Sequence, residues 1–347
     1  MSVQCRTAGV TVQVESENPQ WRAFAMEACA GQQLEHQVAE ENVDVMILVA
    51  DSTRPFDRSG YSPLTRGAWS KGKTVLLEDA CGSGADLLIA VGGDVVRVIA
   101  RIRPTWRHKG LGVLDRSRQV LLHRAAIIQY PALWWAGVRG MAPLHVSAAR
   151  VGGTALLLAG PGGVGKSTLI NGALASHGLP VSDNLCVTDG TVVHGLLEPA
   201  RREQGAGRRM PHGRRESPWA TRIESVRPDH VLVLRRGSGP TALVRPVDTE
   251  VVVREMVGGT YAAGELRRYW AFAATLALGT GCGPAHASVE AAARRLADGI
   301  PASEVVLPAV PGTTLAALAE QAMGAPRPDT AAATGVHDHA RDLRSAS

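Results

Sequence analysis

Two kinds of apolar pattern mark the first third of the chain. Residues 10–14 alternate apolar and polar side chains, which is typical of a strand with one buried face, whereas residues 43–50 (VDVMILVA) form the nearly continuous apolar run of a buried strand. A helix is indicated over residues 21–39, and further strands over 74–77, 86–91 and 95–99. The pattern predicts a separate α/β domain over residues 1–118, which we expect to recognise a substrate or partner. Its basic, proline- and glycine-containing end, residues 101–118, is the predicted linker.

A second α/β unit is predicted over residues 119–323. Buried strands are indicated at 154–159 and 231–234, with short strands near 179–181, 186–188, 191–193 and 305–307. Helical patterns cover residues 166–177, 265–278, 289–296 and 315–323. Beyond them, residues 324–347 are rich in Pro, Ala, Asp and Arg, a composition that predicts a disordered tail.

The segment between the strand at 154–159 and the helix that follows reads GPGGVGKS, a complete GxxxxGK[ST] phosphate-binding loop. A glycine-rich loop in this position directs backbone N–H groups and the positive end of the helix dipole at one point, which suits a polyphosphate. Lys166 is predicted to reach the β- and γ-phosphates, and the Ser167 hydroxyl to hold Mg²⁺. The predicted nucleotide-binding residues are Gly160, Gly162, Gly163, Val164, Gly165, Lys166, Ser167 and Thr168.

Composition narrows the class of protein. The 347 residues are 45% hydrophobic and 20% charged, with a net charge of +5, which fits a globular protein and is too mild to indicate nucleic acid. Five cysteines without a CxxC pair favour reduced thiols over a zinc site or a disulfide framework. No apolar run reaches the roughly 18 residues that span a bilayer, and no signal-peptide core is visible. We therefore expect a cytoplasmic protein with no membrane or nucleic-acid partner.

Three polar residues are candidates for chemistry beside the phosphates. Asp183 follows a short apolar strand after the loop helix, and a strand there can lie beside the loop strand, so its carboxylate could accept the proton of an attacking hydroxyl or hold Mg²⁺; the alternative is an Asp-Asn turn. Glu198 could be a second metal ligand, or a solvated residue before a proline. His145 could be catalytic, although a lone histidine is more often structural.

These residues together resemble the catalytic domain of HPr kinase/phosphorylase and the wider group of HPr-kinase-like proteins. The resemblance lies in Leu144-His145, the loop GPGGVGKST, the segment VSDN and the segment GLLEPAR. It implies a P-loop-containing HPr-kinase-like catalytic domain in which Asp183 serves proton transfer, Glu198 binds the metal and His145 matches a histidine on the strand that leads to the loop. It also implies ATP and Mg²⁺ as cofactors and a homo-oligomer.

The chain departs from the family pattern in three places. Asn184 stands where the family has a second Asp, the EIRG motif is replaced by Glu198-Pro199-Ala200-Arg201, and the C-terminal signature tied to phosphorolysis is absent. We therefore expect a one-way kinase that transfers the γ-phosphate of ATP to a hydroxyl of a peptide or protein serine, or of a small metabolite. The alternative is a nucleotide-dependent switch or ATPase that regulates a partner protein, which the loss of the second Asp favours. No NKxD-like motif for guanine is present.

Arginine is concentrated between residues 201 and 227, where eight arginines occur with three glutamates between them. One interpretation is a solvated flexible loop. The other is a mobile lid that brings an arginine to the γ-phosphate or recruits an acidic substrate. The sequence leaves both open.

Overall fold

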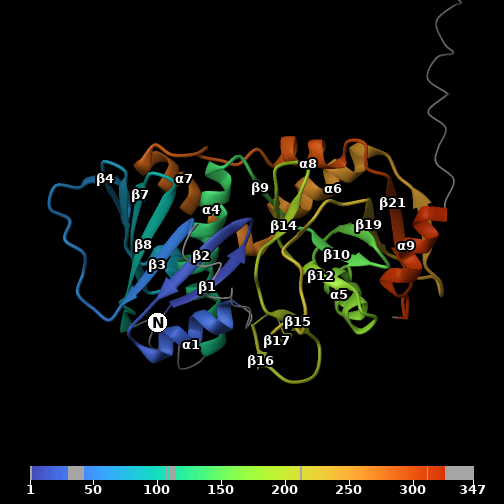
Figure 1. Cartoon of the computed structure of the whole chain (residues 1–347), viewed down its shortest axis with the longest axis horizontal. Helices are drawn as coiled ribbons and strands as arrows, with labels where there is room; N and C mark the ends of the chain where they lie inside the picture. Colours follow the sequence, from blue (N-terminus) through green and yellow to red (C-terminus); the bar gives the residue numbers. More distant parts are fainter. Residues whose placement is uncertain are drawn as a thin grey trace, which may run out of the picture.

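The computed structural model describes residues 2–29, 43–106, 108, 115–211, 213–310 and 312–324. In this part of the chain the fold is mixed α/β, with four sheets of eight, six, four and three strands. Figure 1 shows the eight-stranded sheet on the left and the six-stranded sheet on the right. None of the helices in the described ranges is both long and apolar enough to cross a bilayer.

The eight-stranded sheet is built by the first hundred residues, in the order β1-β2-β3-β8-β7-β6-β5-β4. Only the pairs β2–β3 and β3–β8 are parallel, so most of this sheet is an antiparallel meander. The strands are β1 (Ser2–Thr7), β2 (Val10–Glu15), β3 (Val45–Ala50), β4 (Ser62–Thr65), β5 (Ala68–Lys71), β6 (Thr74–Leu77), β7 (Ala85–Gly92) and β8 (Val95–Ile102), with a short 3₁₀ turn, η2, at Ala80–Gly82.

Helices from the later part of the sequence cover this first sheet. A continuous helical segment, α3 (Arg116–His123), η3 (Arg124–Gln129, with π-helical bonding) and α4 (Tyr130–Val138), contacts β2, β3 and β8 through α4. Helix α7 (Tyr269–Thr280) contacts β4, β5 and β6, while α1 (Pro19–Ala28) packs on β1 and β2. Trp134 and Trp135 on α4 are buried in this core. The first sheet therefore shares a core with segments that the sequence places beyond the predicted boundary at 118, and that boundary stays a prediction.

The six-stranded sheet has the order β12-β10-β11-β19-β21-β20. Its centre, β11 (Thr154–Ala159), β19 (His230–Arg236) and β21 (Ala302–Leu307), is parallel, and the outer strands β10 (Ser147–Val151), β12 (Leu179–Ser182) and β20 (Leu243–Pro246) pair antiparallel. The apolar runs at 154–159 and 231–234 form neighbouring buried strands, as such runs predict. Around this sheet lie α5 (Lys166–Ala175), α6 (Thr249–Ala262), η4 (Gly264–Leu266), α8 (Val289–Ala297) and α9 (Leu315–Gly324).

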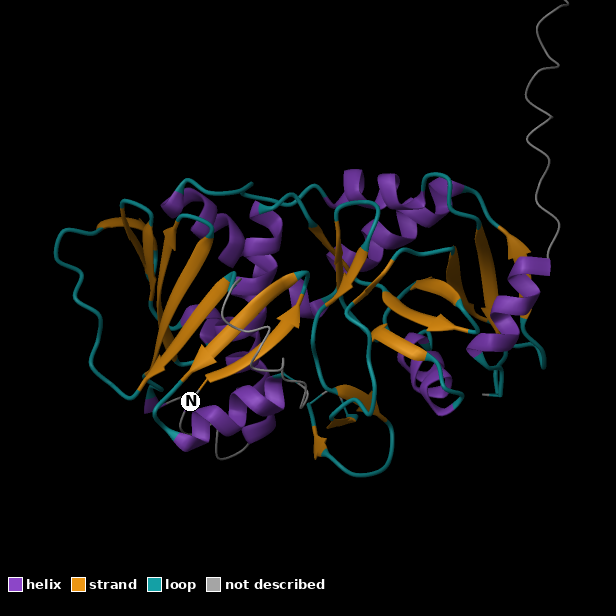
Figure 2. Ribbon diagram, in the orientation of Figure 1, coloured by secondary structure: helices purple, strands orange, loops and turns teal. Residues whose placement is uncertain are grey.

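Two small sheets connect the larger ones. One has the order β18-β14-β13-β9, from β9 (Ala142–Leu144), β13 (Cys186–Thr188), β14 (Val193–Gly195) and β18 (Ser225–Val226). The other is formed by the arginine-rich segment, as β15 (Ala200–Arg202), β17 (Arg215–Ser217) and β16 (Arg208–Arg209), and lies low between the large sheets in Figures 1 and 2. Glu216 on β17 makes a two-bonded ion pair with Arg124, at 2.8 Å for each bond, and each side chain is 2% exposed.

Most predicted elements are present with shifted ends, and the differences are local. Helix α1 covers the first part of the helix predicted over 21–39 and ends at Ala28, with Cys29 as its C-cap, and residues 30–39 lie outside the described ranges. Residues 107 and 109–114 of the predicted linker and residues 325–347 of the predicted tail also lie outside the described ranges. The turn-rich stretch 52–72 contains β4 and β5, and helix α6 forms where no element was predicted.

Candidate active site

The loop of residues 160–165, here called the glycine loop, connects the central strand β11 to helix α5. Gly160, Gly163 and Gly165 have φ values of 140°, 77° and 121°, a region that side chains other than glycine rarely adopt. A Cβ atom on Gly160 would lie 2.8 Å from the carbonyl oxygen of Leu234. The Lys166 ammonium group donates hydrogen bonds to the carbonyl oxygens of Gly160 (2.7 Å) and Pro161 (3.1 Å). The loop is thus a compact backbone cradle folded around its own lysine.

A cavity of about 610 Å³ opens beside this loop. It brings together four residues that the sequence singles out, namely His145, Lys166, Ser167 and Asp183, with Gly162, Gly163 and Gly165. Gly160, Val164 and Thr168 do not line it; Val164 is 3% exposed and packs in the core, and Thr168 faces solvent. The nucleotide-binding role of the loop residues stays a prediction, and those that line a cavity all line this one.

Asp183 reaches the cavity by a different route from the one expected. Strand β12, which precedes it, pairs with β10 and not with the loop strand β11, because β10 forms a hairpin with β11 and occupies that edge. Two successive antiparallel pairings leave β12 running in the same direction as β11, so both strands end at the same edge of the sheet. The Ser167 hydroxyl donates to the backbone carbonyl of Asp183 at 3.3 Å, which fixes the aspartate beside the start of α5.

The Asp183 carboxyl group is 2% exposed and accepts one backbone hydrogen bond, from the N–H of Arg201 at 3.4 Å. Burial raises the pKa of Asp183 to about 6, because the Arg201 charge that favours the ionised form only partly offsets the loss of water. An aspartate with this pKa is still mostly ionised at neutral pH. It is also a stronger proton acceptor than an ordinary aspartate.

His145 lies in the connection between β9 and β10, where its backbone N–H donates to the Thr260 hydroxyl at 2.9 Å. It is therefore near the loop strand in space but not on it. Burial, together with the neighbouring Lys166 charge, lowers the pKa of His145 to about 4. Its Nδ1 atom is buried and has no hydrogen-bond partner among the described residues. At neutral pH the ring is therefore uncharged.

Lys166 is the fixed positive charge of the glycine loop. Burial lowers its pKa to about 8, and the negative charge of Glu265 acts in the opposite direction. Among the residues that the structure describes, no carboxylate makes an ion pair with the ammonium group, and backbone carbonyl oxygens hold it in place. These are weak partners that a phosphate oxygen could replace.

Glu198 does not line this cavity. It is 5% exposed, and its carboxylate accepts hydrogen bonds from the amides of Gln129 and Asn184, both at 3.3 Å, and from the guanidinium of Arg201 at 3.3 and 3.4 Å. Arg201 also contacts Glu265 at 3.1 Å. Burial opposes the charged form of Arg201, but Glu198, Asp183 and Glu265 outweigh that effect and raise its pKa. These contacts form a network, Glu198–Arg201–Glu265, beside the cavity.

Sequence reasoning missed several residues that line the cavity. Helix α6 contributes Arg254, Glu255, Gly258 and Gly259, and the turn after it contributes Glu265. Two arginines of the arginine-rich segment, Arg201 and Arg214, also line it, and the Arg201 side chain is only 11% exposed, so that segment is not simply a solvated loop. The only signal for α6 in the sequence was Val252, Val253 and Met256 at helical spacing, which β-branching and two glycines obscured.

The cavity offers few protein oxygen atoms that could bind a magnesium ion. No group of three or more His, Cys, Asp or Glu side chains in the described ranges is arranged to hold a metal ion. Magnesium in nucleotide sites is usually held by one or two protein oxygens, phosphate oxygens and water. Ser167 and Asp183 line the cavity together and could supply such oxygens, whereas the Glu198 carboxylate is held by Arg201. The metal-binding role of Glu198 stays a prediction.

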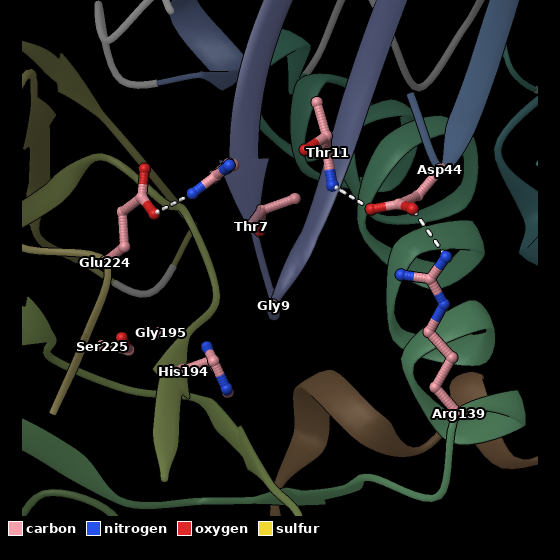
Figure 3. Close-up of a pocket in the computed structure, with 10 residues that line it drawn as sticks. Thr7, Gly9, Thr11, Asp44, Arg139, His194, Gly195, Glu224 and Ser225 are labelled. Atoms are coloured by element: carbon pink, nitrogen blue, oxygen red, sulfur yellow. Dashed lines mark hydrogen bonds and ion pairs between the residues drawn. The ribbon is translucent and has the colours of Figure 1, made fainter. Parts of the chain in front are cut away.

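A second cavity, of about 470 Å³, lies between the β1–β2 hairpin and strand β14. Two ion pairs hold its charged side chains: Arg6 pairs with Glu224 at 3.4 Å, and Arg139 pairs with Asp44 at 2.6 Å, as Figure 3 shows for the second pair. The hairpin also binds the chain just before Glu198, because Ala8 N–H donates to the Gly195 carbonyl oxygen and Leu197 N–H donates to the Thr7 hydroxyl. This cavity shares no lining residue with the first, and it marks the junction that holds residues 195–197 in place.

Comparison with known proteins adds little to this geometry. No protein-family model matches the chain, and no curated protein matches its sequence. Among solved structures, the HPr(Ser) kinase/phosphatase from Coxiella burnetii is similar over 52% of this chain and 87% of its own, at 12% identity and a TM-score of 0.28. A similarity this weak carries no argument about function, so the proposals below depend on the residues of this chain.

Proposed function

We propose that the protein is an ATP- and Mg²⁺-dependent phosphotransferase that moves the γ-phosphate to a hydroxyl group of its substrate. The observation that carries the proposal is the meeting of the glycine loop, its lysine and a buried aspartate of raised pKa in one cavity of about 610 Å³. The loop geometry favours a polyphosphate, and the cavity is within the size range of small-molecule sites. The aspartate separates a phosphotransferase from a simple anion-binding site.

In the proposed step the hydroxyl oxygen of the acceptor attacks the γ-phosphorus, the bond from that phosphorus to the β–γ bridging oxygen breaks, and ADP leaves with that oxygen. The hydroxyl proton moves to the Asp183 carboxylate. Because the pKa of Asp183 is about 6, the carboxylate can accept this proton in the transition state and release it to solvent at neutral pH.

Positive groups on three sides of the cavity would balance the charge of the transferred group. Lys166 comes from the loop, Arg254 from α6, and Arg201 and Arg214 from the arginine-rich segment. Arg254 is exposed and makes no ion pair with any residue in the described ranges. Preorganised donors of this kind act where charge develops, and loss of one typically costs about 10²–10³ in rate.

His145 would act as a neutral group. With its pKa near 4, it carries no charge at neutral pH, so it cannot stabilise phosphate as a cation. Its unpartnered Nδ1 is suited to a hydrogen bond with the acceptor hydroxyl or a phosphate oxygen. In this proposal it orients the reacting group and leaves proton transfer to Asp183.

Bound Mg²⁺ would offset the negative charge of the β- and γ-phosphates. In this chain Ser167 would hold it at the cavity, with the carboxylate of Asp183 or of Glu198 as the second protein ligand. Binding through Glu198 requires Arg201 to release that carboxylate, since the two are now paired.

The test uses γ-labelled ATP, Mg²⁺, the full chain and a lysate of the source organism, with products separated into macromolecules, small molecules and free phosphate. Lys166→Ala and Asp183→Asn are the test variants, and Asp51→Asn, an exposed aspartate outside the cavity, is the matched control. We expect label in one acceptor fraction with the wild-type and control proteins, and none with the two test variants.

Label found only in free phosphate, and retained by Asp183→Asn, would refute the transfer. It would favour a nucleotide-dependent switch or ATPase that regulates a partner, which the single aspartate of the pattern Asp183-Asn184 also allows.

A further inference from the structure

A third cavity, of about 460 Å³, adjoins the cavity of about 610 Å³ beside the glycine loop, here called the nucleotide cavity after its proposed ligand. The two share Arg201, Gly264 and Glu265, while the consecutive residues Asn184 and Leu185 line one cavity each. They are therefore adjacent spaces with the Arg201–Glu265 ion pair at their common border. A molecule in the third cavity would be within reach of Asp183 by passing this one ion pair.

The walls of the third cavity are mainly apolar. Six leucines and one alanine from several elements meet there: Leu133, Leu185, Leu196 and Leu266 are buried, and Leu121, Leu122 and Ala125 are partly exposed. A concave, largely apolar surface with a few polar groups is the usual form of a small-molecule site. By contrast, the nucleotide cavity is lined mostly by charged residues and glycines.

The polar groups of the third cavity carry an excess of positive donors. Arg118 and Arg268 lie at its edge, are exposed, and make no ion pair with any residue that the structure describes. Asp115, the one aspartate at the edge, already accepts hydrogen bonds from the Ser117 hydroxyl (2.6 Å) and the Arg118 backbone N–H (3.0 Å).

Deeper in the same cavity, two guanidinium groups have a donor without an acceptor. The Nε atoms of Arg124 and Arg201 are buried and have no hydrogen-bond partner in the described part of the chain. The terminal nitrogens of Arg124 are paired with Glu216, and those of Arg201 with Glu198 and Glu265. Arg124 is 2% exposed, so no bulk water compensates for its missing acceptor. The cavity thus combines an apolar interior with guanidinium N–H groups that lack a hydrogen-bond acceptor.

We propose that this third cavity binds the phosphate acceptor, and that the acceptor is an apolar molecule or chain end that carries a carboxylate beside its hydroxyl. The proposal rests on the phosphotransferase function proposed above. The leucine-lined interior takes the apolar part, Arg118 and Arg268 attract the carboxylate, and the hydroxyl points across Arg201 toward Asp183. A small hydroxy acid and a peptide C-terminus share this chemistry.

The probes for this cavity are β-hydroxydecanoate, its methyl ester and N-acetyl-leucylserine, each titrated by calorimetry into the full chain with and without ATP and Mg²⁺. Because one charged hydrogen bond contributes about 1.5–3 kcal/mol, we expect the acid to bind at least about tenfold more tightly than the ester. Tighter binding and phosphorylation of N-acetyl-leucylserine would assign the peptide source, and the reverse would assign the small acid.

Neighbouring arginines provide matched variants. Arg268→Gln should weaken acid binding by at least about tenfold and leave ester binding unchanged, whereas Arg267→Gln, at an exposed residue outside the cavity, should change neither. Ala125→Phe should fill the cavity and prevent binding of both acid and ester; if that variant does not fold, Leu122→Phe is the substitute.

Equal affinity for acid and ester, equal effects of Arg268→Gln and Arg267→Gln, or full binding in the filled variant would each overturn the acceptor cavity. ATP binding, measured in the same samples, separates this from the proposed function. A chain that binds ATP but no acid overturns only the acceptor cavity, and a chain that binds acid but no ATP overturns the phosphotransferase and, with it, the acceptor role.

Discussion

The raised pKa of Asp183 makes a quantitative prediction about pH. With a pKa of about 6, about nine-tenths of the carboxyl is ionised at pH 7 and about one-tenth at pH 5. If the ionised form is the base, kcat/KM for loss of the γ-phosphate from ATP falls about tenfold between these values. An aspartate with an ordinary pKa of about 3.9 would remain more than nine-tenths ionised at pH 5, and the rate would hardly change.

A second limb is expected above neutrality. Lys166 has a pKa of about 8 in the free protein, so about nine-tenths of its charge is lost at pH 9, and the affinity for nucleotide should fall there. His145, with a pKa of about 4, adds no step between pH 5 and 9. The profile of kcat/KM should therefore be a bell between about pH 6 and pH 8.

The assay measures the rate at which labelled phosphate leaves ATP, at low ATP concentration and constant ionic strength, between pH 5 and 9. Circular dichroism at each pH shows whether the fold persists. A rate at pH 5 within twofold of that at pH 7 would refute the raised pKa or the base role. So would an Asp183→Asn variant that retains both its activity and the acidic limb.

Three further predictions concern the loop, the buried ion pair and the packing of helix α7 on the first sheet. Gly160→Ala should lower ATP affinity at least about tenfold in calorimetry, since it combines about 1–3 kcal/mol of backbone strain with a clash against a carbonyl oxygen. Gly172→Ala, on α5 outside the cavity and with open space at its Cβ, should have little effect. Glu216→Gln should lower the free energy of unfolding in urea by about 3–5 kcal/mol, because it leaves Arg124 buried without its ion pair. A Glu216→Leu/Arg124→Met double variant should recover most of this loss. A loss below about 1 kcal/mol in the single variant would contradict the reasoning. Gly279→Ala should cost about 1–3 kcal/mol in the same assay, because a Cβ there would overlap side chains of the first sheet, and an unchanged midpoint would show that α7 is not packed as described.

The strands and the loop could be read from the sequence because their signals are local. The runs at 154–159 and 231–234 are apolar almost throughout, which in a strand of this length indicates burial on both faces, and they form neighbouring parallel strands. Three glycines of the loop, Gly160, Gly163 and Gly165, occupy positions of positive φ, which sequence alone can indicate. These features gave the location of the site without any knowledge of the long-range pairing.

The rest of the site depends on tertiary contacts that no local pattern encodes. Helix α6 contains three successive valines and two glycines, all weak helix formers, and forms because Val252, Val253 and Met256 pack in the core. The prediction for Asp183 assumed that its strand lies directly beside the loop strand β11, whereas β10 lies between the two strands. The Arg201 contacts with Glu198 and Glu265 join residues from a loop and a turn, and nothing in their spacing indicates them.

The two sides of the candidate site are held by different sheets. The glycine loop and Asp183 are at strand ends of the six-stranded sheet, whereas the third cavity is lined by η3 and η4, which continue into α4 and precede α7. Those two helices pack on the eight-stranded sheet. A shift of the first sheet relative to the second would therefore change the third cavity most, and it would change the cavity beside the glycine loop only where η4 borders it. Because the Arg201–Glu265 ion pair borders both cavities, such a shift would reach the cavity beside the glycine loop through this contact.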